Sequence, residues 1–383
     1  MHFHNLLNQW DWDEVSQQIK AQTHAQVIDA LNQNRPSLNH LMALLSPAAQ
    51  PLLENLARKS YHLTRQRFGK VIHLYIPIYL SSYCENNCVY CGFKVSNSMK
   101  RKCLNKQELL DEGLAVARTP FKHVLLVSGE AGKKVGCDYY LEAIEMFTPY
   151  FSQISLEVQP LQSYEYEKLV HKGLHGVFIY QETYHQKHYP LYHPRGPKSD
   201  FAFRLETPER LGKAGVRKIG LGTLIGLEDW RTEAFFTALH LSYLRKKFWK
   251  TNYSVSFPRL RPIDGPGFQP RFTTQERDLT QLICAYRLFD PDLELSLSTR
   301  ESANFRDNAF PLGITAMSAG SKTNPGAYAQ QDSLQQFSIN DERSPEQIAQ
   351  MIQSKGFEPI WKDWSLFLQQ NNSDNALKPT QSI

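Results

Sequence analysis

The sequence lacks the features that would place the protein in a membrane or direct it out of the cell. No run of apolar residues approaches the roughly 20 that a membrane-spanning helix needs. Residues 1–15 contain no basic segment followed by an apolar stretch, which is the pattern of a secretory signal. We therefore expect a cytoplasmic protein that does not associate with a membrane.

The sequence also has little excess charge of either sign. The formal net charge is only +5 over 383 residues, and no Lys/Arg run is interleaved with aromatic residues. Nucleic-acid-binding surfaces concentrate basic charge, so we expect no nucleic-acid partner. The hydrophobic fraction of 41% and the charged fraction of 21% are ordinary for a globular protein that can bury a core without disulfides.

Cysteine is scarce, and its six positions are unevenly spread. Disulfides are rare in a reducing compartment, so a cluster of cysteines in such a chain needs another explanation. Cys84, Cys88 and Cys91 fall within eight positions, and no cysteine follows Cys284. The remaining three are scattered, and we expect them to be small buried hydrophobic residues: Cys103, Cys137 and Cys284.

The spacing of the three clustered cysteines is typical of an iron–sulfur site. Cysteine thiolates are the usual ligands of such clusters, and this spacing lets one short loop reach three irons of a [4Fe–4S] cubane. The fourth iron then has an open position, which the amino and carboxylate groups of S-adenosylmethionine can chelate. The alternative is a zinc site, with His73 or Cys103 as the fourth ligand, in a binding module without catalysis.

Short apolar runs alternate with helical patterns along most of the chain. The runs lie at residues 71–80, 123–129, 154–159, 176–182, 218–226, 252–258, 293–299 and 314–320. Each is bounded by turn residues or a helix, as parallel strands buried on both faces should be. Eight strands that alternate with helices predict an α/β fold of the (β/α)8 TIM-barrel type, and the alternative is an open doubly wound sheet.

The barrel prediction divides the chain into three parts. We expect a helical N-terminal extension over residues 1–70, the barrel over 71–330, and a C-terminal extension over 331–383 whose tail is disordered. The N-terminal extension is expected to cover one end of the barrel. Helices are expected to start near Asp11, Ser46, Asn105 and Ser344.

In a barrel of this type, active residues lie at the C-terminal ends of the strands. The polar candidates there are the Cys84–Cys91 loop, Ser128 to Glu130, Glu157 to Gln159, Gln181, Glu182, Thr223, Arg259, Ser298 to Arg300 and Ser318. Arg300 has the clearest physical case, because a fixed guanidinium binds a substrate carboxylate bidentately. Ser298 lies on the same face of the strand, and Arg259 and Arg261 are further candidates for the pocket.

The segment CENNCVYC matches the signature of the radical S-adenosylmethionine superfamily. Over roughly residues 70 to 330 the chain resembles the tyrosine lyases of bacterial thiamine biosynthesis, the 2-iminoacetate synthases. The stretches that carry the resemblance are VSGE (127–130), LEVQPL (156–161), YQETYH (180–185), 193–231, PRLRP (258–262), LSLSTRES (295–302) and MSAGSKTNPG (317–326).

The resemblance implies one cluster per chain and a defined reaction. An external one-electron donor reduces the cluster, and S-adenosylmethionine splits into methionine and a 5′-deoxyadenosyl radical. That radical takes a hydrogen from the amino group of L-tyrosine. The Cα–Cβ bond then breaks to give 2-iminoacetate (dehydroglycine) and p-cresol. The family supplies the thiazole moiety of thiamine and associates with thiazole synthase, so we expect that protein as a partner.

The resemblance also assigns residues to the cofactors. It makes Cys84, Cys88 and Cys91 the cluster ligands and brings Tyr90 near the adenine. The backbone of Ser128, Gly129 and Glu130 would meet the amino group of S-adenosylmethionine, and Gly129 would permit a close approach. The resemblance also implies that Glu182 accepts hydrogen bonds from the ribose hydroxyls and that Arg204 pairs with the methionyl carboxylate.

For the substrate, the resemblance places Arg300 and Ser298 on the tyrosine carboxylate. His193 is expected to shape a loop and has no catalytic role. The group that handles the phenolic proton of tyrosine is not identified by any pattern. Because nothing after Cys284 is a cysteine, the second cluster of the hydrogenase-maturation tyrosine lyases cannot form in the familiar way. Tryptophan-cleaving and deazaflavin-making relatives remain alternatives.

Overall fold

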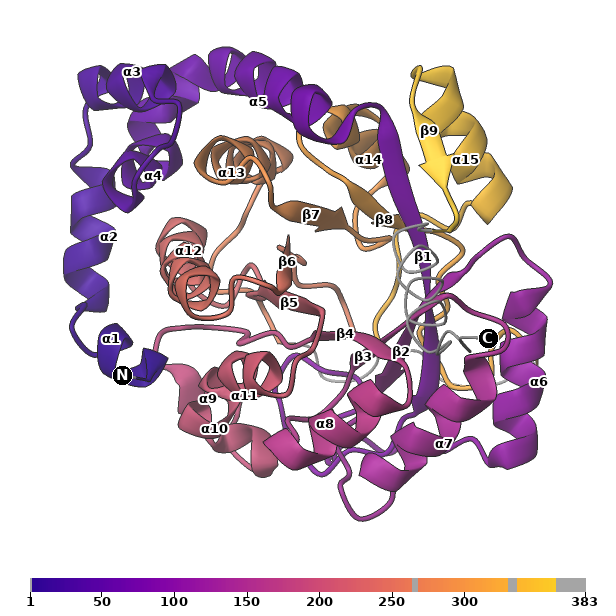
Figure 1. The fold of residues 1–383 in the computed structure, drawn as a ribbon. Coiled ribbons are helices and arrows are strands. Elements are labelled where there is room, and N and C mark those ends of the chain that lie inside the picture. Colours follow the sequence, from indigo (N-terminus) through magenta and orange to yellow (C-terminus); the bar gives the residue numbers. More distant parts are fainter. Residues whose placement is uncertain (1, 264–267, 330–335, 363–383) are drawn as a thin grey trace, which may run out of the picture.

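Eight parallel strands close into a barrel in the computed structural model, which describes residues 2–263, 268–329 and 336–362 (Figure 1). Each strand pairs with the next along the chain, and β8 pairs with β1 to close the ring. The strands are β1 (Val71–Ser81), β2 (His123–Ser128), β3 (Gln153–Glu157), β4 (Leu174–Phe178), β5 (Lys218–Gly222), β6 (Asn252–Ser256), β7 (Glu294–Leu297) and β8 (Ala316–Ser318). The predicted fold class is confirmed.

Helices follow the strands and cover the outside of the barrel (Figure 1). The strands are short and apolar because both of their faces are buried, one by the barrel interior and one by the helices. The helices between strands are α6 (Lys106–Ala117), α7 (Cys137–Phe147), α8 (Ser163–His171), α9 (Tyr189–Tyr192), α10 (Phe201–Leu205), α11 (Thr207–Lys213), α12 (Trp230–Lys247), α13 (Glu276–Phe289) and α14 (Ala303–Ala309).

The N-terminal helices lie along the flank of the barrel that α12 and α13 form, and not over one end of it as expected (Figure 1). They are α1 (Phe3–Leu7), α2 (Trp12–Lys20), α3 (His24–Asn32), α4 (Leu38–Leu45) and α5 (Leu53–Phe68). Aromatic contacts fasten this layer: the Phe3 ring stacks on His240 at 3.7 Å, and Trp12 stacks on Phe236 at 5.3 Å between ring centroids. The extension is therefore part of the outer helical layer.

A ninth strand that the sequence did not predict pairs with the beginning of β1. This strand, β9 (Glu358–Ile360), follows α15 (Pro345–Ser354). β9 pairs with residues 71–73 of β1, whereas β2 pairs with the later residues 76–81. β9 therefore occupies the part of the β1 edge that β2 does not reach.

Most predicted helix starts are confirmed by their caps. Asn105 and Ser344 each form a capping box, and the Asp11 carboxylate accepts hydrogen bonds from the first turn of α2. The start at Ser46 is wrong as an α-helix, because residues Pro47–Leu52 form a 3₁₀ turn before α5. Pro51 causes this, since it has no N–H to donate to the carbonyl four residues earlier.

Three further expectations concern a membrane span, the C-terminal tail and the division of the chain. Within the described ranges, no helix has the length and apolar character to span a bilayer. The tail that the sequence predicts to be disordered lies outside the described residues. The division of the chain at about residues 70 and 330 stays a prediction.

Candidate active site

An open cavity lies at the mouth of the barrel where the strands end. Counting the space at its mouth, it encloses about 1420 Å³. Every residue to which the resemblance assigned a cofactor or substrate role lines this one cavity: Cys84, Cys88, Tyr90, Cys91, Ser128, Gly129, Glu130, Glu182, Arg204, Ser298 and Arg300. The barrel topology therefore gathers side chains from segments as distant as residues 84 and 300.

The three clustered cysteines lie on the loop that follows β1. None of them is in a disulfide. Burial raises the pKa of Cys84 and raises that of Cys88 far more strongly. A buried thiol of this kind becomes a thiolate only when a metal or another positive group compensates the charge. A donor set of three thiols that line one cavity therefore suits an iron–sulfur cluster.

The residues after β2 brace this loop. The Gly129 N–H donates to the Ser81 carbonyl at 2.9 Å, and the Glu85 N–H donates to the Glu130 carbonyl at 2.8 Å. A Cβ atom on Gly129 would lie 2.3 Å from the Tyr83 carbonyl oxygen. The structure thus shows Gly129 in close approach to the cysteine loop itself. The Ser128 hydroxyl is turned to Tyr140 at 2.8 Å.

A second segment, residues 192–198, holds the same loop from the other side. The N–H groups of Asn87 and Val89 donate to the carbonyls of Arg195 and Tyr192. Gly196 has a φ of +101°, and a Cβ there would lie 2.4 Å from the Asn86 side-chain oxygen. Only glycine fits this position without displacing the cysteine loop.

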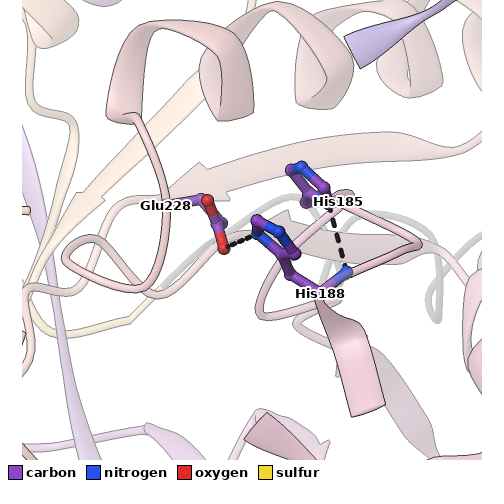
Figure 2. Close-up of side chains that lie close together, drawn as sticks. All are labelled: His185, His188 and Glu228. Carbon is purple, nitrogen blue, oxygen red and sulfur yellow. Dashed lines mark hydrogen bonds and ion pairs between the residues drawn. The ribbon is translucent and has the colours of Figure 1, made fainter. Parts of the chain in front are cut away.

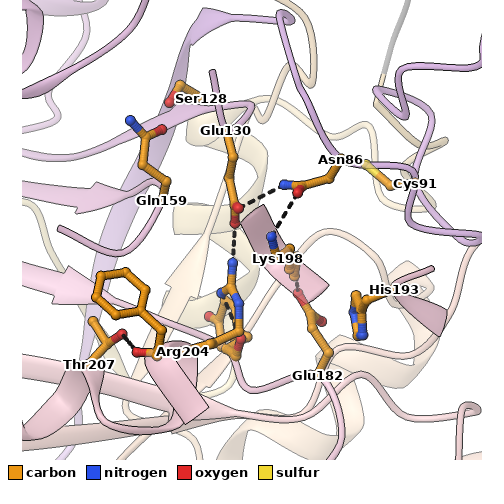
Figure 3. Close-up of polar contacts among 12 residues, drawn as sticks. Asn86, Cys91, Ser128, Glu130, Gln159, Glu182, His193, Lys198, Arg204 and Thr207 are labelled. Carbon is orange, nitrogen blue, oxygen red and sulfur yellow. Dashed lines mark hydrogen bonds and ion pairs between the residues drawn. The ribbon is translucent and has the colours of Figure 1, made fainter. Parts of the chain in front are cut away.

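Charged side chains form a continuous network beside the cysteines (Figure 3). Glu130 pairs with Arg204 and also accepts from the Asn86 amide at 2.7 Å. Asn86 Oδ1 accepts the Lys198 N–H at 2.8 Å, and Lys198 Nζ pairs with Glu182 Oε1 at 2.6 Å. Burial opposes ionisation of Glu130, but Arg204 and Lys198 outweigh it and lower the pKa of that carboxyl.

Glu182 has an unusual backbone conformation. It is the only non-glycine residue with a positive φ, at 70°, in the described parts of the chain. Such a conformation costs of order 1–3 kcal/mol and persists only where the surroundings impose it. The Glu182 carbonyl accepts the Leu224 N–H at 2.8 Å while its carboxylate holds Lys198. Backbone strain of this kind is typical of functional sites.

Tyr90 is fixed by His193. The Tyr90 hydroxyl lies 2.7 Å from His193 Nε2, and His193 Nδ1 lies 3.1 Å from the Tyr189 carbonyl oxygen. Nδ1 must donate to that carbonyl, so Nε2 accepts the tyrosine proton. Burial lowers the pKa of His193 well below its usual value, which keeps the imidazole neutral. His193 therefore positions the Tyr90 ring as well as shaping its loop.

Arg300 faces the cavity without a carboxylate partner. Within the described residues its guanidinium forms no ion pair, and it lies over the Phe337 ring at 3.5 Å. Ser298 lines the cavity beside it. Arg259, by contrast, is bound to Glu301 and does not line the cavity, whereas Arg261 does. A cation held against an aromatic face and left unpaired suits an anionic ligand.

Gln336 connects the cysteine loop to the barrel. Its Nε2 lies 3.7 Å from Cys91 Sγ, and its Oε1 accepts the Tyr79 hydroxyl at 2.7 Å. Its backbone is fixed as well, because its N–H donates to Thr323 and its carbonyl accepts the Gly92 N–H. A hydrogen-bond donor beside a cluster sulfur influences the electronic properties of the cluster.

Sequence reasoning missed several of these residues. Lys198, Gln336 and Phe337 line the cavity but follow no strand directly, whereas Asn86 lies within the predicted Cys84–Cys91 loop. Lys198 lies within residues 193–231, one of the stretches that carry the family resemblance, so the sequence did contain a signal that this residue belongs to the site. Gln336 and Phe337 lie in the expected C-terminal extension, where no motif pointed to the site.

A second polar cluster lies outside the cavity lining, at His185, His188 and Glu228 (Figure 2). The two imidazoles are stacked 3.8 Å apart with an interplanar angle of 4°. Their in-plane lone pairs therefore do not converge on one point. The Arg271 guanidinium also lies 3.2 Å from both His188 Nδ1 and Glu228 Oε1. This arrangement favours an ion-pair network over a metal site.

Two protein-family models match the chain. Residues 78–239 match the radical SAM superfamily, and residues 256–358 match the Biotin and Thiamin Synthesis associated domain. The first match contains the cysteine loop and the charged network. The second contains Arg300 and Gln336.

Curated relatives match almost the whole chain. The chain is 49% identical over 368 residues to a 2-iminoacetate synthase of Escherichia coli, which covers 96% of this chain and 97% of the relative. It is 48% identical, with the same coverage, to a 2-iminoacetate synthase of Salmonella typhimurium. Among solved structures, HydG, a maturase of the [FeFe]-hydrogenase, has a TM-score of 0.88 at 28% identity. That match covers 93% of this chain and 81% of HydG.

Proposed function

The chain belongs to the 2-iminoacetate synthases of the radical S-adenosylmethionine superfamily, and from that premise we propose how its cavity residues carry out the reaction. The enzyme is a carbon–carbon lyase that cleaves L-tyrosine between Cα and Cβ to give 2-iminoacetate for thiamine biosynthesis. One observation carries the assignment of roles: three free thiols and an unpaired guanidinium face the same cavity.

The cofactors supply the radical and the protein supplies the site. When bound, a [4Fe–4S] cluster and S-adenosylmethionine furnish the 5′-deoxyadenosyl radical that takes a hydrogen from the substrate amino group. Cys84, Cys88 and Cys91 hold the cluster in this proposal, and one cluster binds per chain. The brace from Gly129 and from residues 192–198 keeps their loop in one conformation.

The charged network would hold S-adenosylmethionine. Glu182 would accept hydrogen bonds from the ribose and Arg204 would pair with the methionyl carboxylate, while the Ser128–Glu130 backbone would meet the amino group. Arg204 pairs with Glu130 and Lys198 with Glu182, and these ion pairs hold all four side chains at the cavity wall. Tyr90, held by His193, would face the adenine.

Arg300 and Ser298 would bind the α-carboxylate of tyrosine. The guanidinium is free of carboxylates among the described residues, so a substrate carboxylate does not have to displace an existing partner. Stacking on Phe337 fixes the plane of the guanidinium and prepares it for a bidentate contact. The apolar side chains of Leu125, Val127 and Phe178 line the same cavity and exclude water from the ring of the substrate.

The product and the electron supply call for partners. 2-Iminoacetate hydrolyses readily, so direct transfer to a thiazole synthase would protect it. An external one-electron donor must reduce the cluster. Anaerobic co-purification tests the first contact, and clean separation at high concentration in low salt would count against it. A cytoplasmic location stays a prediction.

An anaerobic assay with dithionite, S-adenosylmethionine and L-tyrosine tests the proposed function. We expect 5′-deoxyadenosine and p-cresol together. Formation of 5′-deoxyadenosine without p-cresol would leave the radical chemistry in place and refute the substrate. A parallel assay with L-tryptophan measures whether the site with Arg300 and Ser298 accepts another amino acid. We expect no cleavage of L-tryptophan.

A further inference from the structure

Glu157 is a carboxylate in the cavity with no role in the reaction so far. It is the last residue of β3 and lines the cavity wall. Its register partner on β2 is the apolar Val127, and Phe178 of β4 lines the same cavity. Within residues 2–263, 268–329 and 336–362, its carboxylate takes part in no hydrogen bond or ion pair.

The other two carboxylates of the cavity wall are already engaged. Glu130 is held by Arg204 and Asn86, and Glu182 is held by Lys198. The tyrosines near Glu157 are poor proton acceptors. The Tyr79 hydroxyl donates to Gln336, and burial raises the pKa of Tyr79 well above its usual value. Glu157 is therefore the free proton acceptor among the described residues that line the cavity.

Glu157 lies across the barrel mouth from Arg300 and Ser298, the residues proposed to bind the substrate carboxylate. In the ring of eight strands, β3 and β7 are four strands apart, so their ends lie on opposite sides of the mouth. Arg300 and Ser298 follow β7, and Glu157 ends β3. The carboxylate and the hydroxyl of tyrosine are likewise at opposite ends of the molecule. A tyrosine bound to Arg300 through its carboxylate can thus direct its ring across the cavity toward Glu157.

We propose that the Glu157 carboxylate is the general base that accepts the phenolic proton of the substrate and returns it to the product. This inference rests on the proposed cleavage of tyrosine. It names the group that no sequence pattern identified. It also makes Glu157 a specificity determinant, because a substrate ring without a hydroxyl would leave a buried carboxylate without a partner.

The step balances in atoms and electrons. As the Cα–Cβ bond of the nitrogen-centred substrate radical breaks, one of its electrons completes the C=N bond of 2-iminoacetate and the other remains on the benzylic carbon. The phenolic O–H electron pair stays on oxygen, and its proton moves to Glu157. The benzylic fragment then takes one electron from the one-electron donor, which is oxidised. It also takes one proton at carbon from water and one at oxygen from Glu157, which gives p-cresol.

The acidity of Glu157 suits this task. Burial raises its pKa to about 7, although the Arg300 cation acts in the opposite direction. A general base works best when its pKa lies near the working pH. The titratable and charged groups that act on Glu157, or on which it acts, come from the surrounding elements. They are Tyr75, Tyr79, Tyr180, Glu182, Lys198, Arg204 and Arg300.

The test compares wild-type enzyme with Glu157→Gln, an isosteric change that cannot accept a proton. For the wild type, kcat/KM should rise with pH through about 7 as Glu157 loses its proton, and the variant should lose this inflection. We expect p-cresol formation to fall about 100-fold or more, because general-base catalysis is worth roughly 10²–10⁴ in rate. Formation of 5′-deoxyadenosine should fall far less, since hydrogen abstraction from the amino group precedes proton transfer.

Substrates with a more acidic phenol distinguish the two possible roles of Glu157. They depend less on a general base, but they would not compensate for the loss of a merely structural residue. With ring-fluorinated tyrosines, whose product is the correspondingly fluorinated p-cresol, the Glu157→Gln variant should recover much of its product formation relative to wild type. The control is Glu145→Gln, which removes an exposed carboxylate of α7 that pairs with Lys172 on the surface. It should match wild type with every substrate. Iron content and the thermal midpoint confirm that both variants are folded and loaded.

Four outcomes decide the question. Loss of p-cresol with retained 5′-deoxyadenosine and rescue by fluorinated substrates supports the proposal. An equal loss of both products without rescue, or a variant with wild-type rates and pH profile, overturns it. A wild-type enzyme that forms no p-cresol would instead refute the proposed function itself, so the two failures are distinguishable.

Discussion

Cys88 is the most deeply buried of the three clustered cysteines, and its thiol has no protein disulfide partner. Cys88→Ala should abolish iron binding and the formation of both 5′-deoxyadenosine and p-cresol, because one cluster ligand is lost. Iron analysis after anaerobic reconstitution and product detection measure this. Cys137→Ala, at a half-buried cysteine on α7, is the matched control and should keep both iron and activity. Retained activity in Cys88→Ala would refute the cluster assignment.

The proposed contact of Arg300 with the tyrosine carboxylate can be tested by a substitution that keeps the positive charge and removes the planar guanidinium group. Arg300→Lys should raise KM for L-tyrosine roughly tenfold to 100-fold, since one charge-assisted hydrogen bond is worth about 1.5–3 kcal/mol. Cleavage of S-adenosylmethionine in the absence of substrate should not change. Steady-state kinetics on both reactions provides the measurement. An unchanged KM would mean that the tyrosine carboxylate binds elsewhere in the cavity.

Gln336 offers an electrochemical readout. Gln336→Leu removes the amide donor near Cys91 Sγ, and the cluster potential should become more negative. A hydrogen bond with a net worth of about 1 kcal/mol corresponds to roughly 40 mV for a one-electron couple. A redox titration followed by electron paramagnetic resonance measures the shift. Gln17→Leu, at an exposed position of α2, is the control, and an equal potential in both variants would contradict the role of Gln336.

At the scale of elements, the loop of residues 192–198 controls the cysteine loop through Gly196. Gly196→Ala combines a positive φ with a contact of 2.4 Å to Asn86, so the cysteine loop must move. We expect a large loss of bound iron with little change in the thermal midpoint. Gly215→Ala is the matched control, because Gly215 also has a positive φ but nothing within 4 Å. Equal iron content in the two variants would contradict a role for the contact between residue 196 and Asn86.

The elements that sequence predicted best are those determined by local patterns. The eight apolar strand runs and the capping boxes at Asn105 and Ser344 need only neighbours in the chain, and the structure confirms them. β9 was missed because its three residues are too few to show a strand pattern. It forms only because the edge of β1 is available to it.

The candidate site likewise contains residues that local sequence patterns could place and residues that they could not. Residues that directly follow a strand, such as Arg300, were placed at the mouth because the barrel topology puts every strand end there. Lys198 and Gln336 reach the cavity through long loops, and their positions depend on contacts between segments far apart in the sequence. Local patterns carry no information about such contacts. The partners of Glu130 and Glu182 were unpredictable for the same reason.

At the scale of the whole molecule, the distribution of the cysteines supports the proposal of one cluster per chain. Cys103, Cys137 and Cys284 lie outside the cavity lining, and Cys284 is fully buried in the core. We expect about four irons per chain after reconstitution. Metal analysis with quantified protein checks this number, with Cys88→Ala as the blank. A value near eight would require a second cluster that the sequence gives no ligands for.

The pairing of β9 with β1 has a consequence for biosynthesis. The first strand of the barrel meets β8 and β9 through residues 71–75, and its partners there are made some 240 residues later or more. During translation this half of β1 therefore leaves the ribosome with both of its edges open, and only β2 and the residues 76–81 can pair early. Contacts so far apart in sequence slow folding and expose unpaired edges. The nascent chain should thus need protection from aggregation until its last strand has been synthesised.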